Sequence, residues 1–88
     1  MKKKVGEVSE EEKKEILMLF ERKNGLAELA KIVKDDDVLY EKLVTDMGAT
    51  STKFQAWWDT MSKKYQWKLK EGGNWEIDFE TNTIYLVY

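Results

Sequence analysis

The 88-residue sequence contains no histidine, no cysteine and no proline. Without cysteine the chain can form no disulfide, and zinc and iron–sulfur sites lose their usual thiolate ligands. Without histidine the commonest general base is missing. A glycine-rich phosphate-binding loop is missing as well. A chain this short buries only about 60–65% of its unfolded surface, so its stability depends on good packing or on oligomerisation. We therefore expect one domain over residues 1–88 that is not an enzyme and that uses no cofactor and no metal ion.

An excess of charge of either sign is also missing. The 15 basic and 17 acidic residues give a net charge of -2, whereas proteins that bind nucleic acids or membrane surfaces usually carry a basic excess. The lysines at positions 2–4 precede no apolar run, which argues against a signal peptide, and no stretch is long enough to span a bilayer. These features predict a soluble cytoplasmic protein with no nucleic-acid or membrane partner and with a flexible N-terminus over 1–8.

The aromatic residues are concentrated at one end of the chain. Nine of the 11 lie after position 53, and all four tryptophans are among them. The long segment before them is charged and rich in helix-forming residues. The sequence therefore predicts an α+β domain, in which a helical hairpin over 9–65 precedes a compact aromatic sheet over 66–88.

Two amphipathic helices are predicted, over residues 10–34 and 37–65. Ser9 is a suitable N-cap for the first helix, and Glu12 occupies the capping-box position. Apolar side chains then recur every three or four residues, which is the period of a helix. In the first segment they are Ile16, Leu19, Leu26, Ala30 and Val33, with Lys23 in the slot between Leu19 and Leu26. In the second they are Leu39, Leu43, Met47, Phe54, Trp57 or Trp58, Met61 and Tyr65, with Thr50 in the slot between Met47 and Phe54. Because only a short acidic turn joins the segments, we expect an antiparallel two-helix hairpin.

The aspartates at 35–37 and two glycines each leave two interpretations. The aspartates could bind a cation, but their position before a helix favours an N-terminal cap. Gly25 and Gly48 lie at similar distances from the turn, so they should meet at the same height of the hairpin. Either the helices approach closely there or both kink there.

Residues 66–88 contain three segments in which apolar and polar residues alternate, as they do in strands. The segments are 66–70, 75–80 and 83–88. A two-residue turn at 81–82 pairs Ile77 with Leu86 and places the large apolar side chains of both strands on one face. A three-residue loop at 72–74 brings the first segment beside the second. The prediction is a three-stranded antiparallel β-meander that packs on the end of the helical hairpin, near Phe54, Trp58 and Met61.

Two charged segments could carry chemistry, but both favour a structural interpretation. Glu76, Asp78 and Glu80 alternate along one predicted strand, on a face that we expect to be solvated. Without burial the pKa values of these carboxyl groups should not be shifted strongly, as catalysis would require. The basic and aromatic run 63–70 has the composition of a platform for single-stranded nucleic acid. In an acidic chain its aromatic residues are more typical of a core, so nucleic-acid binding is the weakest alternative. The lysines concerned are Lys63, Lys64, Lys68 and Lys70.

Two features indicate a surface for a partner. Trp57 and Trp58 lie about 100° apart on a helix, so one can cover the neighbouring helix while the other meets the sheet or a second protein. In the predicted meander the last strand, 83–88, lies at an edge and has no Lys, Glu or proline to guard it. We predict that this edge accepts an extended peptide or a second subunit. The predicted contact residues are Trp57, Ile84, Tyr85, Leu86 and Val87.

Three runs of the sequence resemble a known family. They are 19–26 (LFERKNGL), 53–65 (KFQAWWDTMSKKY) and 74–81 (NWEIDFET). The runs are similar to the small proteins called CXXX repeat peptide modification system proteins, and the resemblance covers nearly the whole chain. It implies an accessory role beside a ribosomally synthesised peptide with repeated cysteines and the radical-SAM maturase that modifies it. It supplies no catalytic residues.

The function predicted from these observations is that of a non-enzymatic accessory protein. Its ligand would be the precursor peptide, the radical-SAM maturase, or both. The alternative is a structural or regulatory homodimer built on the helical hairpin, because the apolar stripes and the adjacent tryptophans provide more apolar surface than one hairpin covers.

Overall fold

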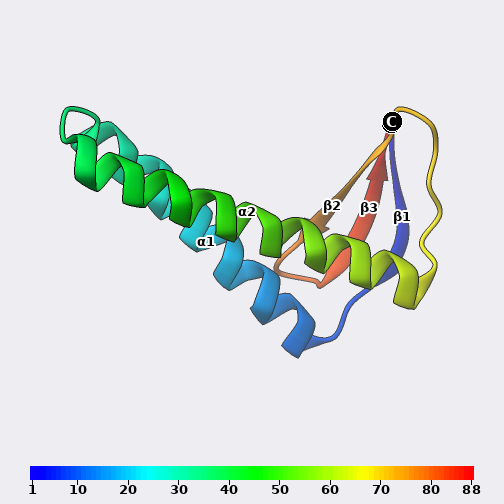
Figure 1. Ribbon diagram of the computed structural model, residues 1–88. Helices are drawn as coiled ribbons and strands as arrows, with labels where there is room; N and C mark the ends of the chain where they lie inside the picture. Colours follow the sequence, from blue (N-terminus) through cyan, green and yellow to red (C-terminus); the bar gives the residue numbers. More distant parts are fainter.

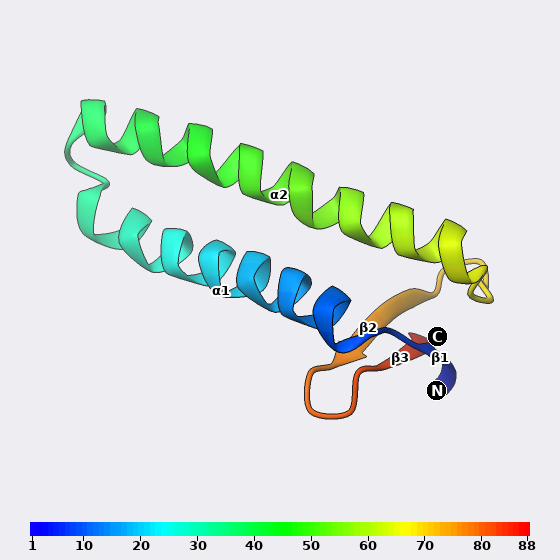
Figure 2. The same ribbon diagram turned by 90° about the horizontal axis from the view of Figure 1, so that it is seen from below.

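A computed structural model describes residues 1–88 as two helices and three strands (Figure 1). In chain order the elements are β1 (Lys2–Glu7), α1 (Glu10–Val33), α2 (Asp37–Tyr65), β2 (Asn74–Asp78) and β3 (Thr83–Val87). The helices lie side by side and a short turn joins them into a hairpin (Figure 2). The strands form one antiparallel sheet near the end of the hairpin where α1 begins and α2 ends. The α+β class predicted from the sequence is confirmed, and both helices match the predicted segments.

The order of the strands differs from the predicted meander. It is β1-β3-β2, so β3 is the central strand and is antiparallel to both neighbours. The third strand therefore comes from the N-terminal segment 1–8, which the sequence predicted to be flexible. Lysine has a low strand propensity, which hides β1 in the sequence. The same residue is typical of an exposed edge strand, which is the place that β1 occupies.

Residues 66–73 connect α2 to β2 without joining the sheet. Gln66 ends α2 with φ of 52°, in the left-handed region, and this conformation turns the chain away from the helix axis. Trp67 is consequently buried, with 7% of its surface exposed, whereas Leu69 is 67% exposed. The alternation over 66–70 thus reflects one buried tryptophan in a loop, and the strand predicted there is wrong.

The register of β2 and β3 lies two residues away from the predicted one. Ile77 is opposite Ile84 and Trp75 is opposite Leu86, because the connection spans residues 79–82 instead of two residues. A shift by two keeps every side chain on its predicted face. These four apolar side chains therefore share the face toward the helices, and the acidic residues of β2 share the outer face.

The helices are capped as the sequence predicts. Ser9 Oγ accepts a hydrogen bond from the Glu12 N–H (3.1 Å), and Glu12 Oε1 accepts one from the Ser9 N–H (2.8 Å). Asp36 caps α2, since its side chain accepts a hydrogen bond from the Leu39 N–H (3.1 Å). The three aspartates at 35–37 belong to no cluster that could hold a metal ion. The hydrogen bond of Asp36 confirms the interpretation of this segment as an N-terminal cap.

Gly25 and Gly48 lie inside continuous helices. A Cβ atom added at either glycine would meet nothing within 4 Å. The close approach predicted at these positions is therefore wrong, and neither glycine breaks its helix. Their effect on stability reduces to the intrinsic cost of glycine in a helix.

The core lies where the sheet meets the hairpin. Its buried apolar members are Val8, Ile16, Trp57, Met61, Trp67 and Ile84. Toward the turn between the helices, only Leu43 and Thr50 are buried, while Ile32 is 78% exposed and Val38 is 65% exposed. Neither helix combines the length and the apolar character that a membrane crossing requires. The hairpin thus carries uncovered apolar surface far from the sheet.

Candidate functional site

The residues predicted to contact a partner lie in two different environments. Trp57, Ile84 and Leu86 are buried in the core, with at most 4% of their surface exposed, whereas Tyr85 and Val87 are half-buried on the outer face of the sheet. Because β3 is the central strand, its main-chain groups pair with strands on both sides. The prediction that the C-terminal strand forms an open edge is therefore wrong, since β1 occupies that edge.

The open edges of the sheet belong to β1 and β2, and the backbone pairing shows which groups are free. The Tyr88 N–H donates to Met1 O (2.8 Å), and the Val8 N–H donates to Asn82 O (2.9 Å). In antiparallel sheets, hydrogen-bonded residue pairs alternate with pairs that are not hydrogen-bonded. The even-numbered residues of β3 therefore direct their main-chain groups to β1, and the odd-numbered residues direct theirs to β2.

The main-chain groups of Trp75 and Ile77 point to the open edge of β2. These residues lie opposite Leu86 and Ile84, which bond to β1, whereas Glu76 lies opposite an odd-numbered residue and bonds to β3. Because side chains alternate along a strand, the side chains of Trp75 and Ile77 share the face toward the helices. The edge of β2 therefore presents free N–H and C=O groups directly beside apolar side chains.

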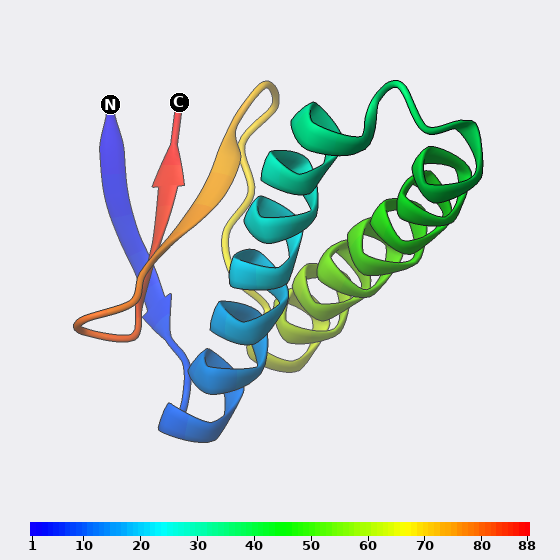
Figure 3. The same cartoon turned by 90° about the vertical axis from the view of Figure 1, so that its left-hand side faces the viewer.

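Two adjoining hollows run along this edge, and together they form what we call the β2 groove. One hollow, of about 320 Å³, is lined by Phe20, Phe54, Trp58, Trp75, Glu76, Ile77 and Phe79. The other, of about 310 Å³, is lined by Phe54, Gln55, Trp58, Leu69, Gly73, Asn74 and Trp75. Figure 3 shows β2 as the strand nearest to the helices. The β2 groove thus has a strand edge on one side and helices on the other, and each hollow has a size that suits a few side chains.

Aromatic contacts hold the walls of the β2 groove in place. Phe20 packs against Phe79 with ring centroids 5.5 Å apart, and Phe54 meets Trp58 edge to face at 6.5 Å. The indole N–H of Trp75 donates to a main-chain oxygen of the loop before β2 (3.0 Å). None of these five rings is fully buried. Gathered apolar surface of this kind marks interaction sites in proteins.

The outer face of the sheet is acidic beside the edge of β2. Glu76 projects there with 58% of its side chain exposed, and Asp78 shares this face. Lys2 of β1 reaches Glu76 from across the sheet, at 3.7 Å, in an exposed ion pair of small energetic value. Because residues 2–4 are all lysine, the two edges of the sheet carry opposite charge.

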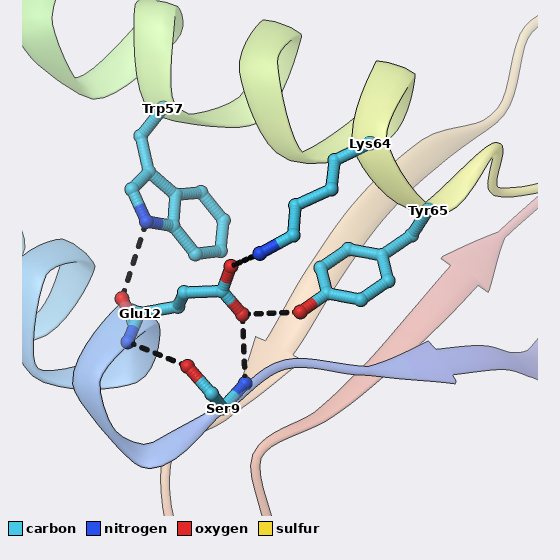
Figure 4. Close-up of polar contacts among 5 residues, drawn as sticks. All are labelled: Ser9, Glu12, Trp57, Lys64 and Tyr65. Atoms are coloured by element: carbon cyan, nitrogen blue, oxygen red, sulfur yellow. Dashed lines mark hydrogen bonds and ion pairs between the residues drawn. The ribbon is translucent and has the colours of Figure 1, made fainter.

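A second constellation, the Glu12 cluster, joins the beginning of α1 to the end of α2 (Figure 4). It consists of Ser9, Glu12, Trp57, Lys64 and Tyr65. Glu12 Oε2 accepts a hydrogen bond from Lys64 Nζ (2.6 Å), and Glu12 Oε1 accepts one from the Tyr65 hydroxyl. The main-chain oxygen of Glu12 accepts a hydrogen bond from Trp57 Nε1 (3.1 Å). One residue therefore both caps α1 and ties it to α2.

The carboxyl group of Glu12 has a low pKa. Burial opposes its ionisation, but the hydrogen bonds donated by Lys64, Tyr65 and Ser9 outweigh burial and lower the pKa to about 2. The hydrogen bond with Glu12 in turn raises the pKa of the Lys64 amine and the pKa of the Tyr65 phenol. At neutral pH Glu12 is therefore ionised, while Lys64 and Tyr65 keep their protons. This arrangement suits a structural role better than proton transfer.

The basic and aromatic run 63–70 does not form an open stacking platform. Trp67 is buried, and Tyr65 stacks on its ring with centroids 5.7 Å apart. Lys70 Nζ lies 4.2 Å from the ring centroid of Tyr88. The rings that would stack with bases are thus occupied by contacts within the protein.

Hollows also lie between the two helices. The largest, of about 540 Å³, is lined by Met18, Leu19, Arg22, Asp46, Ala49, Thr50 and Lys53. Four of these seven residues are polar or charged, and Arg22 Nε donates a hydrogen bond to Thr50 Oγ1 (3.2 Å). Helices also satisfy their own backbone hydrogen bonds and leave few directional groups for a ligand. The β2 groove is therefore the stronger candidate site.

The sequence indicates only part of the β2 groove. It places Phe54 and Trp58 near the sheet, because their helical spacing aligns them with the aromatic end of the chain. The sequence assigns Trp75 and Ile77 to the central strand of the predicted meander, where the segment 66–70 would pair with one edge and the segment 83–88 with the other. Phe20 lies in the apolar stripe of the first helix, and nothing in the sequence distinguishes it from its neighbours.

Comparisons of the chain with protein-family models, with curated proteins and with solved structures find no match. The family resemblance of the three sequence runs therefore stays a prediction, and the geometry of the β2 groove carries the functional argument.

Proposed function

We propose that the protein is a non-enzymatic binding module whose ligand is an extended peptide, which adds to the edge of β2 as a fourth strand. The observation that carries this proposal is the free main-chain edge at Trp75 and Ile77 beside the aromatic walls of the β2 groove. Strand addition is a recurring mode of peptide recognition, in which main-chain hydrogen bonds give affinity and pockets for alternate side chains give specificity. The β2 groove offers both kinds of contact.

The biological setting that we propose is the modification of a ribosomally synthesised peptide with repeated cysteines. The support for this setting is the family resemblance alone. The precursor peptide is the first candidate ligand, and an extended segment of its radical-SAM maturase is the second. In either case this protein binds and positions a segment, while the maturase supplies the chemistry.

The proposal is tested by removing one free N–H group from the edge of β2. Peptides are first selected on the wild-type protein from a random library displayed on phage. Their affinities are then measured through the tryptophan fluorescence of the protein, since Trp58 and Trp75 line the groove. Ile77→Pro removes an edge donor without breaking the ladder to β3. We expect it to weaken binding about tenfold. A synthetic cysteine-repeat peptide, titrated in the same way, tests the biological setting.

Two further variants serve as controls. Ile77→Ala keeps the N–H group and therefore separates the loss of the side chain from the loss of the donor. Lys4→Pro places a proline on the outer edge of β1, where the same alternation leaves the N–H group free, so it should not change binding. The proposal is wrong if Ile77→Pro melts like the wild type and still binds the selected peptides with unchanged affinity, or if selection yields no binder.

A homodimer built on the hairpin is a second candidate function. The observation that favours it is the exposure of apolar side chains near the turn between the helices. Leu29, Ile32, Val38, Leu39 and Val44 are between 45% and 78% exposed. An apolar region of this kind is typical of an interface. Since it lies away from the sheet, a dimer formed there would present two β2 grooves.

A further inference from the structure

A strand added beside β2 has two faces, and the fold gives each face a different environment. Ligand residues opposite Trp75 and Ile77 direct their side chains toward the helices, because cross-strand partners point to the same face. The ligand residue opposite Glu76 points to the outer face. In an antiparallel arrangement this last pair is not hydrogen-bonded, so its Cα atoms lie only about 4.5 Å apart and its side chains are close.

The face toward the helices suits apolar side chains. The walls there are the rings of Phe20, Phe54, Trp58 and Phe79, together with the side chains of the strand edge. Lys23 Nζ already lies 4.8 Å from the ring centroid of Phe54, so this end of the wall carries a positive charge. A second cation would lose hydration in the groove and meet a charge of the same sign. Apolar side chains would instead remove water from the exposed rings.

The outer face suits cations. Glu76, Asp78 and Glu80 occupy alternate positions of the chain at this edge. Asp78 Oδ1 accepts a hydrogen bond from the Glu80 N–H (2.9 Å), which orients its carboxylate locally. Lys2 offsets part of the negative charge, through Glu76. A negative surplus remains, and opposite charges that face each other across strands stabilise the pair, whereas like charges destabilise it.

We propose that the occupant of the β2 groove is an extended segment in which apolar residues alternate with lysine or arginine. This inference rests on the proposed function and adds to it the sequence pattern of the ligand. The apolar residues fill the groove, and the basic residues lie opposite Glu76 and beside Asp78 on the outer face.

The same charges argue against a second copy of this chain as the occupant. Two β2 strands related by a twofold axis would bring the acidic residues of one copy against those of the other. The remaining open edge, β1, carries lysine on both faces. Lys3 shares the face of Leu86, so pairing of β1 with the β2 groove of another copy would direct a lysine into the apolar wall.

The test uses three capped seven-residue peptides with valine at the odd positions. Their even positions carry lysine in the first peptide, glutamine in the second and glutamate in the third. Each is titrated into the full-length protein at low salt, and binding is followed by tryptophan fluorescence. We expect the lysine peptide to bind about tenfold more tightly than the glutamate peptide, with the glutamine peptide between them. The difference should shrink at high salt.

Charge reversal at one position locates the effect. Glu76 is exposed, so Glu76→Lys should preserve the fold while it weakens binding of the lysine peptide and strengthens binding of the glutamate peptide. Glu41→Lys makes the same change in net charge on the exposed surface of α2, near the turn between the helices. It should leave the order of the three peptides unchanged.

The outcomes separate this inference from the proposed function. Equal binding of all three peptides, with Ile77→Pro weakening each, overturns the sequence pattern and leaves strand addition standing. Tightest binding of the glutamate peptide overturns the pattern as well. If no peptide binds, and the phage library yields none that Ile77→Pro weakens, both ideas fail. Self-association that Ile77→Pro abolishes would identify a second copy as the occupant and overturn the proposed ligand.

Discussion

At the scale of single residues, Glu12 makes both local hydrogen bonds, at the beginning of α1, and long-range hydrogen bonds, to the end of α2. Its capping box with Ser9 links residues three positions apart, and the sequence alone predicts it. Its partners Lys64 and Tyr65 lie 52 and 53 residues away, and no sequence pattern indicates them. Because these hydrogen bonds exist only in the folded protein, the ionisation of Glu12 contributes to the free energy of folding.

The stability of the protein should fall in acid between about pH 4.5 and about pH 2. The pKa of Glu12 is lowered from 4.5 to about 2 by folding. A lowered pKa stabilises the folded state above the unfolded value, and this contribution is lost as the pH falls through the folded value. We expect a loss of about 1–2 kcal/mol, allowing for solvent screening. Urea unfolding at a series of pH values measures it.

Glu12→Gln should remove most of this pH dependence and destabilise the protein by about 1–2 kcal/mol at pH 7. A weaker slope should remain, because hydrogen bonds from Lys4 and Lys13 also lower the pKa of Glu7 and of Glu10. Glu11→Gln, at the exposed neighbour, serves as the control. An unchanged acid transition in Glu12→Gln would show that the cluster does not stabilise the fold.

Gly6 is required by a close approach of Trp67. A Cβ atom at this position would lie 2.7 Å from Trp67 Nε1, and the buried ring has little room to move. Gly6→Ala should therefore lower the free energy of unfolding by about 1–3 kcal/mol. Chemical denaturation measures the loss. Trp67→Phe in the same chain should reduce the added cost of Gly6→Ala, because the smaller ring frees space. Equal costs in both backgrounds would exclude this contact as the cause.

At the scale of elements, the two helical glycines differ from Gly6, because nothing approaches them. Gly25→Ala and Gly48→Ala should each stabilise the protein by about 0.5–1 kcal/mol, since alanine has the higher helix propensity. Thermal and urea unfolding provide the measurement. A loss of stability in either variant would indicate a close helix approach that the present structure does not contain.

The elements that the sequence predicts well are those set by local patterns. The capping residues and the apolar period define both helices, and alternation defines β2 and β3. The third strand depends on a competition between distant segments, 2–7 and 66–70, for a place in the sheet. The segment 66–70 has the better strand propensity, but the left-handed conformation of Gln66 and the burial of Trp67 remove it from the sheet. No local pattern contains that information.

The candidate site depends on the same competition. The sequence indicates that an unguarded edge is available for a partner, but the strand that forms it follows from the order β1-β3-β2. With β1 in place, the open edge moves from β3 to β2. The charged residues Glu76 and Asp78 then lie beside a possible ligand instead of beside a neighbouring strand.

At the scale of the whole molecule, the sheet covers only one end of an elongated hairpin. The molecule measures 43 × 28 × 21 Å, and its two termini lie side by side in the sheet (Figure 3). The end of the hairpin that carries the turn therefore has no second layer. Uncovered apolar side chains there, Ile32 above all, are available to a second copy of the chain.

We expect a dimer that forms through this end of the hairpin. Light scattering should give about twice the chain mass of 10.4 kDa. Ile32→Lys should shift the protein toward the monomer, because it places a charge in the apolar interface. Peptide binding should persist in this variant, since the β2 groove lies at the other end. A mass of one chain at high concentration for the wild type would exclude the dimer.

The central claim is that the main-chain edge of β2 is free and accepts a strand, and amide hydrogen exchange tests it most directly. In the free protein, the Trp75 and Ile77 amides should exchange rapidly, whereas the Glu76 amide, which bonds to β3, should be protected. Saturation with the peptide of alternating valine and lysine should slow exchange at Trp75 and Ile77 and leave Glu76 unchanged. Protection of Trp75 and Ile77 equal to that of Glu76 without peptide, or exchange that peptide does not slow, would contradict the account.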